Sequence, residues 1–139
     1  MAAIRRARAD DIPALMAIRA AVRENVLSDP ARVPEQAYHD WIAGPGIWLC
    51  EEAGKVLGFA AADPRDGTVW ALFVDPAAEG QGAGRALLPP ALDDLRAAGW
   101  KRARLTTQPG SRAERFYQLD GWLGAGTAAG GDMVLEKQL

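Results

Sequence analysis

The chain has 139 residues, of which 49% are hydrophobic, and its formal net charge at pH 7 is −2. This length and apolar content predict a single domain over residues 1–139 with enough buried surface for its own core. The weak negative charge gives no reason to expect nucleic acid or an anionic membrane as a partner. No apolar run approaches the roughly 18 residues of a membrane-spanning helix.

One cysteine and one histidine narrow the chemistry further. A single cysteine excludes an internal disulfide, and no signal peptide opens the chain, so we expect a cytoplasmic protein. Cys50 ends the apolar run 47–50, which predicts a buried, unreactive thiol. Because the chain has so few cysteine and histidine ligands, and they are not clustered in the sequence, we expect no metal site.

The N-terminal half predicts a strand, two helices and a three-stranded meander. Residues 3–8 are expected to form the first strand, and Asp10 or Asp11 to cap a helix that reaches about residue 25. A second, short helix is expected over 34–42. Three apolar runs separated by turns then predict antiparallel strands, over residues 47–52, 56–62 and 68–74.

A helix over 83–98 follows, and Gly99 is expected to stop it. Pro89 and Pro90 conflict with this helix, because each removes a backbone N–H and costs about 3 kcal/mol or more in a straight helix. We therefore expect a kink or a break there. The remaining elements are a strand over 103–107, a helix over 111–120 capped by Ser111, and a strand pair over 122–126 and 132–136. This order predicts an α/β fold, a mixed sheet of six to seven strands with about four helices on both faces.

Glycine occupies every second position between the strand that ends near Val74 and the helix behind it, at Gly80, Gly82 and Gly84. Backbone N–H groups at the start of a helix, unshielded by Cβ atoms, can hold a phosphate or diphosphate. A glycine-rich solvent loop is the plainer interpretation. The dinucleotide fingerprint does not fit, because Arg85 stands where its third glycine should be, and no Walker lysine follows.

Two segments of the chain, residues 74–88 and 113–122, carry a recognisable pattern. It consists of Val74, Asp75, Pro76, Gly80, Gln81, Gly82, Ala83, Gly84, Arg85, Ala86, Leu87 and Leu88, and then Ala113, Phe116, Tyr117, Gly121 and Trp122. In this order the two segments resemble the GNAT superfamily of N-acetyltransferases, whose loop amides hold the diphosphate of coenzyme A.

The resemblance implies an N-acetyltransferase fold that binds acetyl-CoA as co-substrate and transfers its acetyl group to a primary amine by direct attack in a ternary complex. The pantetheine arm would lie in a splay between the strands that end at Val74 and Thr107. Tyr117 would protonate or stabilise the departing thiolate, and a main-chain N–H near Phe73 or Val74 would polarise the carbonyl. A half-buried aromatic is the other interpretation of Tyr117. The implied coenzyme-binding residues are Phe73, Val74, Glu79, Gly80, Gln81, Gly82, Ala83, Gly84, Arg85 and Phe116.

Three positions depart from the family pattern. Glu79 stands where the family has Arg or Gln, Gly110 where many members have a coenzyme-contacting Asn, and Trp70 where some have a catalytic glutamate. The usual general base is therefore missing, and the enzyme either works through water or binds an amine that is already neutral. The spacing favours none of the other candidate bases, which are Glu24, Asp29, His39 and Glu51.

The acceptor is expected to bind under the helix–loop–helix at residues 23–41, with Glu24, Asn25 and Trp70 as candidate substrate residues. Aromatic and acidic side chains suit a small amine, and acidic ones favour a cation. Two alternatives remain open: a coenzyme A-binding regulatory or interaction module with little turnover, and a protein or peptide N-acetyltransferase. The resemblance also makes a homodimer a possible assembly.

Overall fold

The computed structural model describes residues 2–22 and 33–139. The first predicted helix ends at Ala21 and not near residue 25, because Val22 is already extended, with φ of −68° and ψ of 129°. The predicted substrate residues Glu24 and Asn25 and the candidate base Asp29 lie outside the described residues. The predictions made for them stay predictions.

The N-terminal elements follow the predicted order. They are β1 (Ala3–Arg6), the 3-10 turn η1 (Ala9–Asp11), α1 (Ile12–Ala21) and α2 (Glu35–Ala43). β1 ends two residues earlier than predicted, because the N–H of Arg8 donates to the Asp11 carboxylate at 2.7 Å and opens the turn instead. The backbone N–H of Arg8 therefore bonds to a nearby side chain and not to a neighbouring strand.

Within residues 2–22 and 33–139, seven strands form one mixed sheet in the order β1-β2-β3-β4-β5-β7-β6. All neighbouring strands are antiparallel except β4 and β5, which are parallel and are joined by the crossover helix α3 (Ala83–Ala97). The prediction of a mixed sheet is confirmed. The remaining strands are β2 (Trp48–Glu52), β3 (Lys55–Asp63), β4 (Thr68–Val74), β5 (Arg102–Thr107), β6 (Leu123–Thr127) and β7 (Met133–Gln138).

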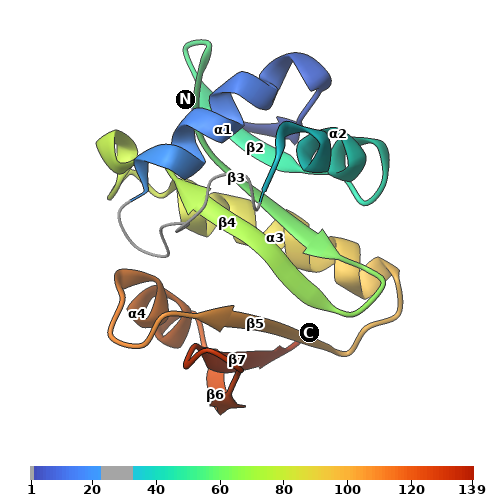
Figure 1. The fold of residues 1–139 in the computed structure, drawn as a ribbon, viewed down its shortest axis with the longest axis vertical. Coiled ribbons are helices and arrows are strands. Elements are labelled where there is room, and N and C mark those ends of the chain that lie inside the picture. The colour runs from blue at the N-terminus through green and yellow to red at the C-terminus, as the bar shows by residue number, and fades with distance from the viewer. Residues whose placement is uncertain (1, 23–32) are drawn as a thin grey trace.

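Two hydrophobic clusters cover the two faces of the sheet (Figure 1). α1 and α2 pack on one face, while α3 packs on the other with Tyr117 of α4 (Arg112–Leu119) in its cluster. Residues of β4 alternate between the two clusters, except at a β-bulge where Ala61 pairs with Ala71 and Ala62 with Val69. Trp70 is the extra residue, and it packs on the α1–α2 side together with Ala71.

α3 runs from Ala83 to Ala97 without a break, although Pro89 and Pro90 lie inside it. The carbonyl groups that lose their helical partners are those of Arg85 and Ala86, and both residues are exposed, so water can satisfy them. The opposite side of the helix buries a row of apolar side chains. Packing of that face keeps the helix continuous, and the break that we considered does not occur.

The predicted helix ends are confirmed. Gly99 follows α3 with φ of +93°, in the left-handed region that glycine reaches without strain. Ser111 caps α4, because its hydroxyl accepts the N–H of Glu114 at 3.1 Å.

Candidate active site

β4 and β5 separate almost as soon as they meet. Within the described residues they share one partner pair, Thr68 with Arg104, whereas β3 pairs with β4 along nearly its whole length. Figure 1 shows the two strands diverging from the end where β5 begins. Beyond Thr68, the edge of β4 that faces β5 therefore has no strand partner, and its N–H and C=O groups are available to an extended ligand.

The loop between β4 and α3 begins with a turn in which the Asp75 carboxylate accepts the N–H of Ala77 at 3.0 Å. Gly80 and Gly82 then take φ values of +81° and +85°, which explains glycine at both positions. A Cβ built at either of them would meet no atom within 4 Å. The loop is therefore an open, left-handed bend.

The first turn of α3 leaves N–H groups without helical acceptors. Gly82 is the N-terminal cap and makes no side-chain cap bond, and the first helical hydrogen bond runs from Ala86 N to Gly82 O at 3.0 Å. The N–H groups of Ala83, Gly84 and Arg85 precede that bond. Together with the positive end of the helix dipole, they form a site that suits an anion.

Gly84 brings three predicted coenzyme-binding residues together. A Cβ at this position would lie 3.6 Å from the Phe116 ring and 3.7 Å from a methyl group of Val74. The start of α3, the end of β4 and helix α4 therefore meet at this point, although Phe116 is far from the others in the sequence. The resemblance implied a coenzyme-binding role for Phe116, but no sequence pattern predicted its contact with Gly84.

Glu79, one of the three residues that depart from the family pattern, is paired in the structure. Its carboxylate accepts a hydrogen bond from the Arg112 guanidinium, at the first residue of α4. The pair joins the loop after β4 to the helix after β5, on opposite sides of the splay. Arg112 therefore offsets the negative charge that we expected to repel a phosphate, and no local sequence signal pointed to this partner.

Tyr117 is buried, with 6% of its surface exposed. Its ring makes edge contacts with Phe116 and Trp122, with centroids 5.3 and 5.5 Å away. Burial raises the pKa of the phenol well above its usual range, and the Asp120 carboxylate adds to the shift. Tyr117 therefore keeps its proton at neutral pH and can donate a hydrogen bond, but it cannot act as a base.

Trp70 lies on the α1–α2 side of the sheet. Its indole stacks on Trp41 of α2 with centroids 4.3 Å apart and an interplanar angle of 14°, and Tyr38 meets its edge at 6.2 Å. The bulge in β4 turns Trp70 toward this face. The residue that fills the usual glutamate position is thus part of an aromatic wall and supplies no base.

Arg19 of α1 adds a cation that the sequence analysis missed. Its guanidinium carbon lies 4.3 Å from the centroid of the Phe73 ring, and burial lowers the pKa of the group from its ordinary value. The sequence analysis named no site residue in this helix. The described part of this side of the sheet therefore carries positive charge next to a predicted coenzyme residue.

Two of the candidate bases lie within the described residues, and both have partners. Glu51 is held by Arg5 at 2.8 Å, and this hydrogen bond lowers the pKa of the carboxyl group. His39 lies on α2, 3.4 Å from the Glu35 carboxylate. Neither arrangement points to a role in catalysis.

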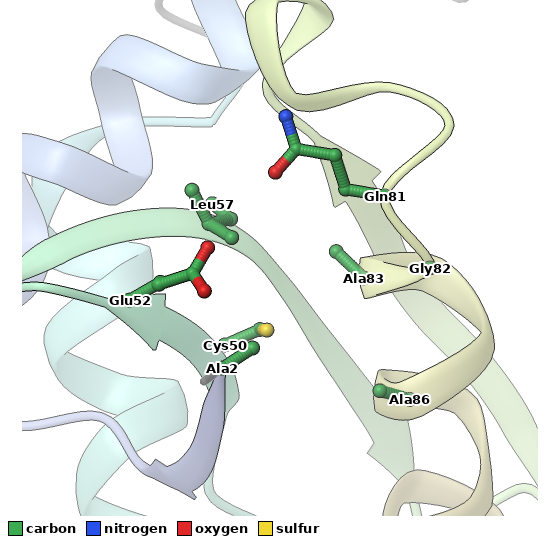
Figure 2. Close-up of a pocket in the computed structure, with 8 residues that line it drawn as sticks. All are labelled: Ala2, Cys50, Glu52, Leu57, Gln81, Gly82, Ala83 and Ala86. Atoms are coloured by element: carbon green, nitrogen blue, oxygen red, sulfur yellow. The ribbon is translucent and has the colours of Figure 1, made fainter.

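A cavity of about 360 Å³ lies beside the first turn of α3 (Figure 2). Gln81 and Ala83 form one wall, and Glu52 and Cys50 the other. None of its lining residues comes from β4, β5 or α4, so the cavity lies outside the splay. Cys50 is fully buried, and burial raises the pKa of its thiol, which confirms the buried cysteine that we predicted.

The described residues contain no cluster of three or more His, Cys, Asp or Glu side chains that could hold a metal ion. Among the same residues, no helix has the length and apolar character needed to span a bilayer.

Residues 12–122 match the acetyltransferase (GNAT) family, so most of the chain is covered and the chain belongs to that family. Mycothiol acetyltransferase of Beutenbergia cavernae is 35% identical over 88 residues. The match covers 59% of this chain and 30% of that protein, so the chain accounts for less than a third of that relative's length.

Solved structures share the fold over the whole chain. The PaiA N-acetyltransferase of Thermoplasma acidophilum, solved with coenzyme A, is 17% identical with a TM-score of 0.85, and the alignment covers 100% of this chain and 99% of that one. The ribosomal-protein-S18-alanine N-acetyltransferase of Escherichia coli is 21% identical with a TM-score of 0.77, over 99% and 94% of the two chains. The predicted fold class is confirmed.

Proposed function

We propose that this protein is an acetyl-CoA-dependent N-acetyltransferase that acetylates the primary amine of a small molecule in a ternary complex. The observation that carries the proposal is the open glycine loop at the start of α3, next to the unpaired edge of β4. Family membership supports it, as does the coenzyme A bound to the PaiA enzyme. The similarity to mycothiol acetyltransferase favours a small acceptor over a protein.

The residues of the loop fit a diphosphate. Nothing lies within 4 Å of the missing Cβ atoms of Gly80 and Gly82, and the N–H groups of the first helical turn have no helical acceptors. Arg85 is exposed in that turn and adds a positive charge, while Gln81 supplies a side-chain amide. We assign the main-chain groups of Phe73 and Val74 to the pantetheine arm, and Glu79, Ala83, Gly84 and Phe116 to the walls around the diphosphate.

Acetyl-CoA supplies an activated thioester carbonyl when it is bound. A main-chain N–H near Phe73 or Val74 donates to the carbonyl oxygen as negative charge develops there. Tyr117 donates a hydrogen bond to the sulfur. The pKa of the buried phenol is raised, whereas a thiol has a pKa of about 8.5. Hydrogen bonding to the departing thiolate therefore suits Tyr117 better than complete proton transfer to it.

The incoming amine must be neutral, and Trp70 cannot deprotonate it. We propose that the amine enters neutral or loses its proton through water. The apparent pKa of kcat/KM should then follow the pKa of the amine across a set of acceptors. An apparent pKa that stays constant for all amines would instead require a protein base.

Calorimetry with acetyl-CoA and a coenzyme A-release assay on a panel of small amines test the proposal. Binding together with release on a small amine is the expected result. Binding without release on any amine or peptide would support the coenzyme A-binding module, and release on peptides alone would support a protein N-acetyltransferase like the E. coli enzyme. Absence of binding would refute the proposal.

Assembly and location belong to the same proposal. Leu119 and Leu123 are 84% and 74% exposed, next to the outer edge of β6, and this apolar edge supports the possible homodimer. Sedimentation of the purified protein would decide between monomer and dimer. The cytoplasmic location stays a prediction from the single cysteine.

A further inference from the structure

Thr107, the last residue of β5, has a buried hydroxyl that finds no partner in the part of the chain that the structure describes. The residue is 3% exposed, and its Oγ1 is buried and makes no hydrogen bond among the described residues. Leaving a buried hydroxyl unpaired costs about 1–3 kcal/mol, and native proteins rarely accept that cost without a reason. A ligand that pairs with the hydroxyl would provide one.

The topology places Thr107 in the splay. β4 and β5 pair at Thr68 and Arg104, and Thr107 lies three residues beyond Arg104, where β5 has left β4. On its other side, β5 remains paired with β7, with Thr107 opposite Met133, so its backbone is held in place. The Thr107 hydroxyl is therefore held in place beside the gap between β4 and β5.

The burial pattern of β5 gives the direction of the side chain. Ala103, Leu105 and Thr107 are buried, whereas Arg104 and Thr106 are exposed. Ala103 and Leu105 belong to the cluster on the α3 face, which also contains Tyr117. By strand alternation, Thr107 lies on the same face as the proposed hydrogen-bond donor to sulfur.

We propose that Thr107 is a coenzyme-binding residue whose hydroxyl hydrogen bonds with the sulfur-bearing end of the pantetheine arm. This inference rests on the proposed function. A diphosphate at the glycine loop lies beyond Val74, so an arm that follows the edge of β4 runs back from there toward Thr68. Thr107 ends β5 three residues beyond the Thr68–Arg104 pair and borders the part of the splay that this arm enters. A hydroxyl can donate to an amide oxygen or sulfur and accept from an amide N–H.

The test compares acetyl-CoA with 3′-phospho-ADP, which keeps the diphosphate and lacks the arm. Thr107→Val removes the hydroxyl and keeps the shape. It should raise the Kd of acetyl-CoA about five- to tenfold, since a hydrogen bond contributes about 1 kcal/mol and a factor of ten corresponds to about 1.4 kcal/mol. The Kd of 3′-phospho-ADP should stay within twofold.

Two further variants serve as controls. Thr107→Ser restores a hydroxyl and should bind acetyl-CoA within about twofold of the unchanged protein. Thr106→Val makes the same substitution on the exposed side of β5 and should change neither affinity. The Tm of ligand-free Thr107→Val should equal or exceed that of the unchanged protein, because an unpaired buried hydroxyl is lost.

Each outcome decides the question. Unchanged acetyl-CoA affinity in Thr107→Val, or equal losses for acetyl-CoA and 3′-phospho-ADP, would overturn the role of Thr107 and leave the proposed function intact. A lower Tm of the free variant would also overturn it, because the hydroxyl would then serve the fold. Failure of the unchanged protein to bind acetyl-CoA would overturn both proposals.

Discussion

At the residue scale, the pairing of Glu79 with Arg112 changes the electrostatics of the glycine loop. Glu79 is 41% exposed and Arg112 is 74% exposed, so the pair contributes little to stability. Its charge still matters to an anion that binds next to it. A loop that would repel a diphosphate through Glu79 alone is close to neutral with Arg112 in contact.

We expect Glu79→Gln to bind acetyl-CoA about two- to fivefold more tightly at low salt, because a negative charge is lost and Arg112 can turn toward the phosphates. The gain should shrink at high ionic strength, where exposed charges are screened. Calorimetry at two salt concentrations measures it, with Glu35→Gln on the exposed part of α2 as control. Weaker binding by Glu79→Gln would contradict this prediction.

Gly82 and Gly99 provide a matched pair at the two ends of α3. Both have positive φ, +85° and +93°, and a Cβ at either would meet no atom within 4 Å. Replacement by alanine therefore costs both helix ends a similar backbone strain, on the order of 1 kcal/mol.

Gly82→Ala should raise the Kd of acetyl-CoA tenfold or more, because the loop must bring its N–H groups to the diphosphate. Gly99→Ala should lower the stability by a similar amount and leave the Kd unchanged. Isothermal calorimetry and urea unfolding of both variants separate the two effects. Equal affinities for the two variants would mean that the loop does not hold the coenzyme.

Tyr117→Phe should lower kcat at least tenfold while the Kd of acetyl-CoA changes less than threefold. The phenol donates to the sulfur in the transition state, whereas the ring supplies the packing against Phe116 and Trp122. Steady-state kinetics on an accepted amine give kcat, and calorimetry gives Kd. An unchanged kcat would remove Tyr117 from the mechanism.

At the element scale, α3 shows how packing overrides a local rule. Pro89 and Pro90 each remove a helical hydrogen bond, and the sequence therefore predicted a kink or a break. The helix continues because its buried side packs against the sheet while the freed carbonyls lie on the exposed side. The cost of each proline is still present in the folded protein.

Pro89→Ala should therefore stabilise the protein. It restores an N–H for the carbonyl of Arg85. Part of the gain is lost, because alanine also raises the conformational entropy of the unfolded chain. We expect the free energy of unfolding to rise by about 1–2 kcal/mol, measured by urea denaturation. No change, or a loss, would mean that the helix is locally distorted to suit the proline.

Other elements followed their local signals closely. Ser111 caps α4 through the N–H of Glu114, and Gly99 stops α3 in the left-handed region. These positions are predictable because one residue and its near neighbours decide them. The bulge at Trp70 was not predicted, since it depends on the register of β4 against β3.

At the scale of the whole molecule, arginines of the sheet form ion pairs with carboxylates on neighbouring elements. Arg5 holds Asp11 and Glu51, and Arg104 holds Glu136. These hydrogen bonds lower the pKa of all three carboxyl groups from their ordinary values. The charged network joins β1, η1 and β2 at one edge of the sheet.

Acid should therefore destabilise the fold. A carboxyl group whose pKa is lower in the folded state stabilises it above the unfolded pKa, about 3.9 for Asp and 4.3 for Glu, and this stability is lost as the pH falls through the folded value. We expect the free energy of unfolding to be level from pH 6 to 8 and to decrease below about pH 4.5. Arg5→Gln should lose less unfolding free energy on acidification than the unchanged protein. Urea unfolding at several pH values measures both proteins, and parallel curves of unfolding free energy against pH would contradict this assignment.

The sequence by itself determined the order of the elements, the glycine bend before α3, the caps at Ser111 and Gly99, and the family. All of these depend on short-range patterns that one stretch of chain contains. That the 139 residues form a single domain stays a prediction.

Only the tertiary structure decided the separation of β4 from β5, the pairing of Glu79 with Arg112, the stacking of Trp70 on Trp41 and the unpaired hydroxyl of Thr107. Each of these features joins groups that are distant in sequence or depends on which face of the sheet is covered. No local pattern encodes such contacts, because their energies arise only when the sheet and its helices pack together.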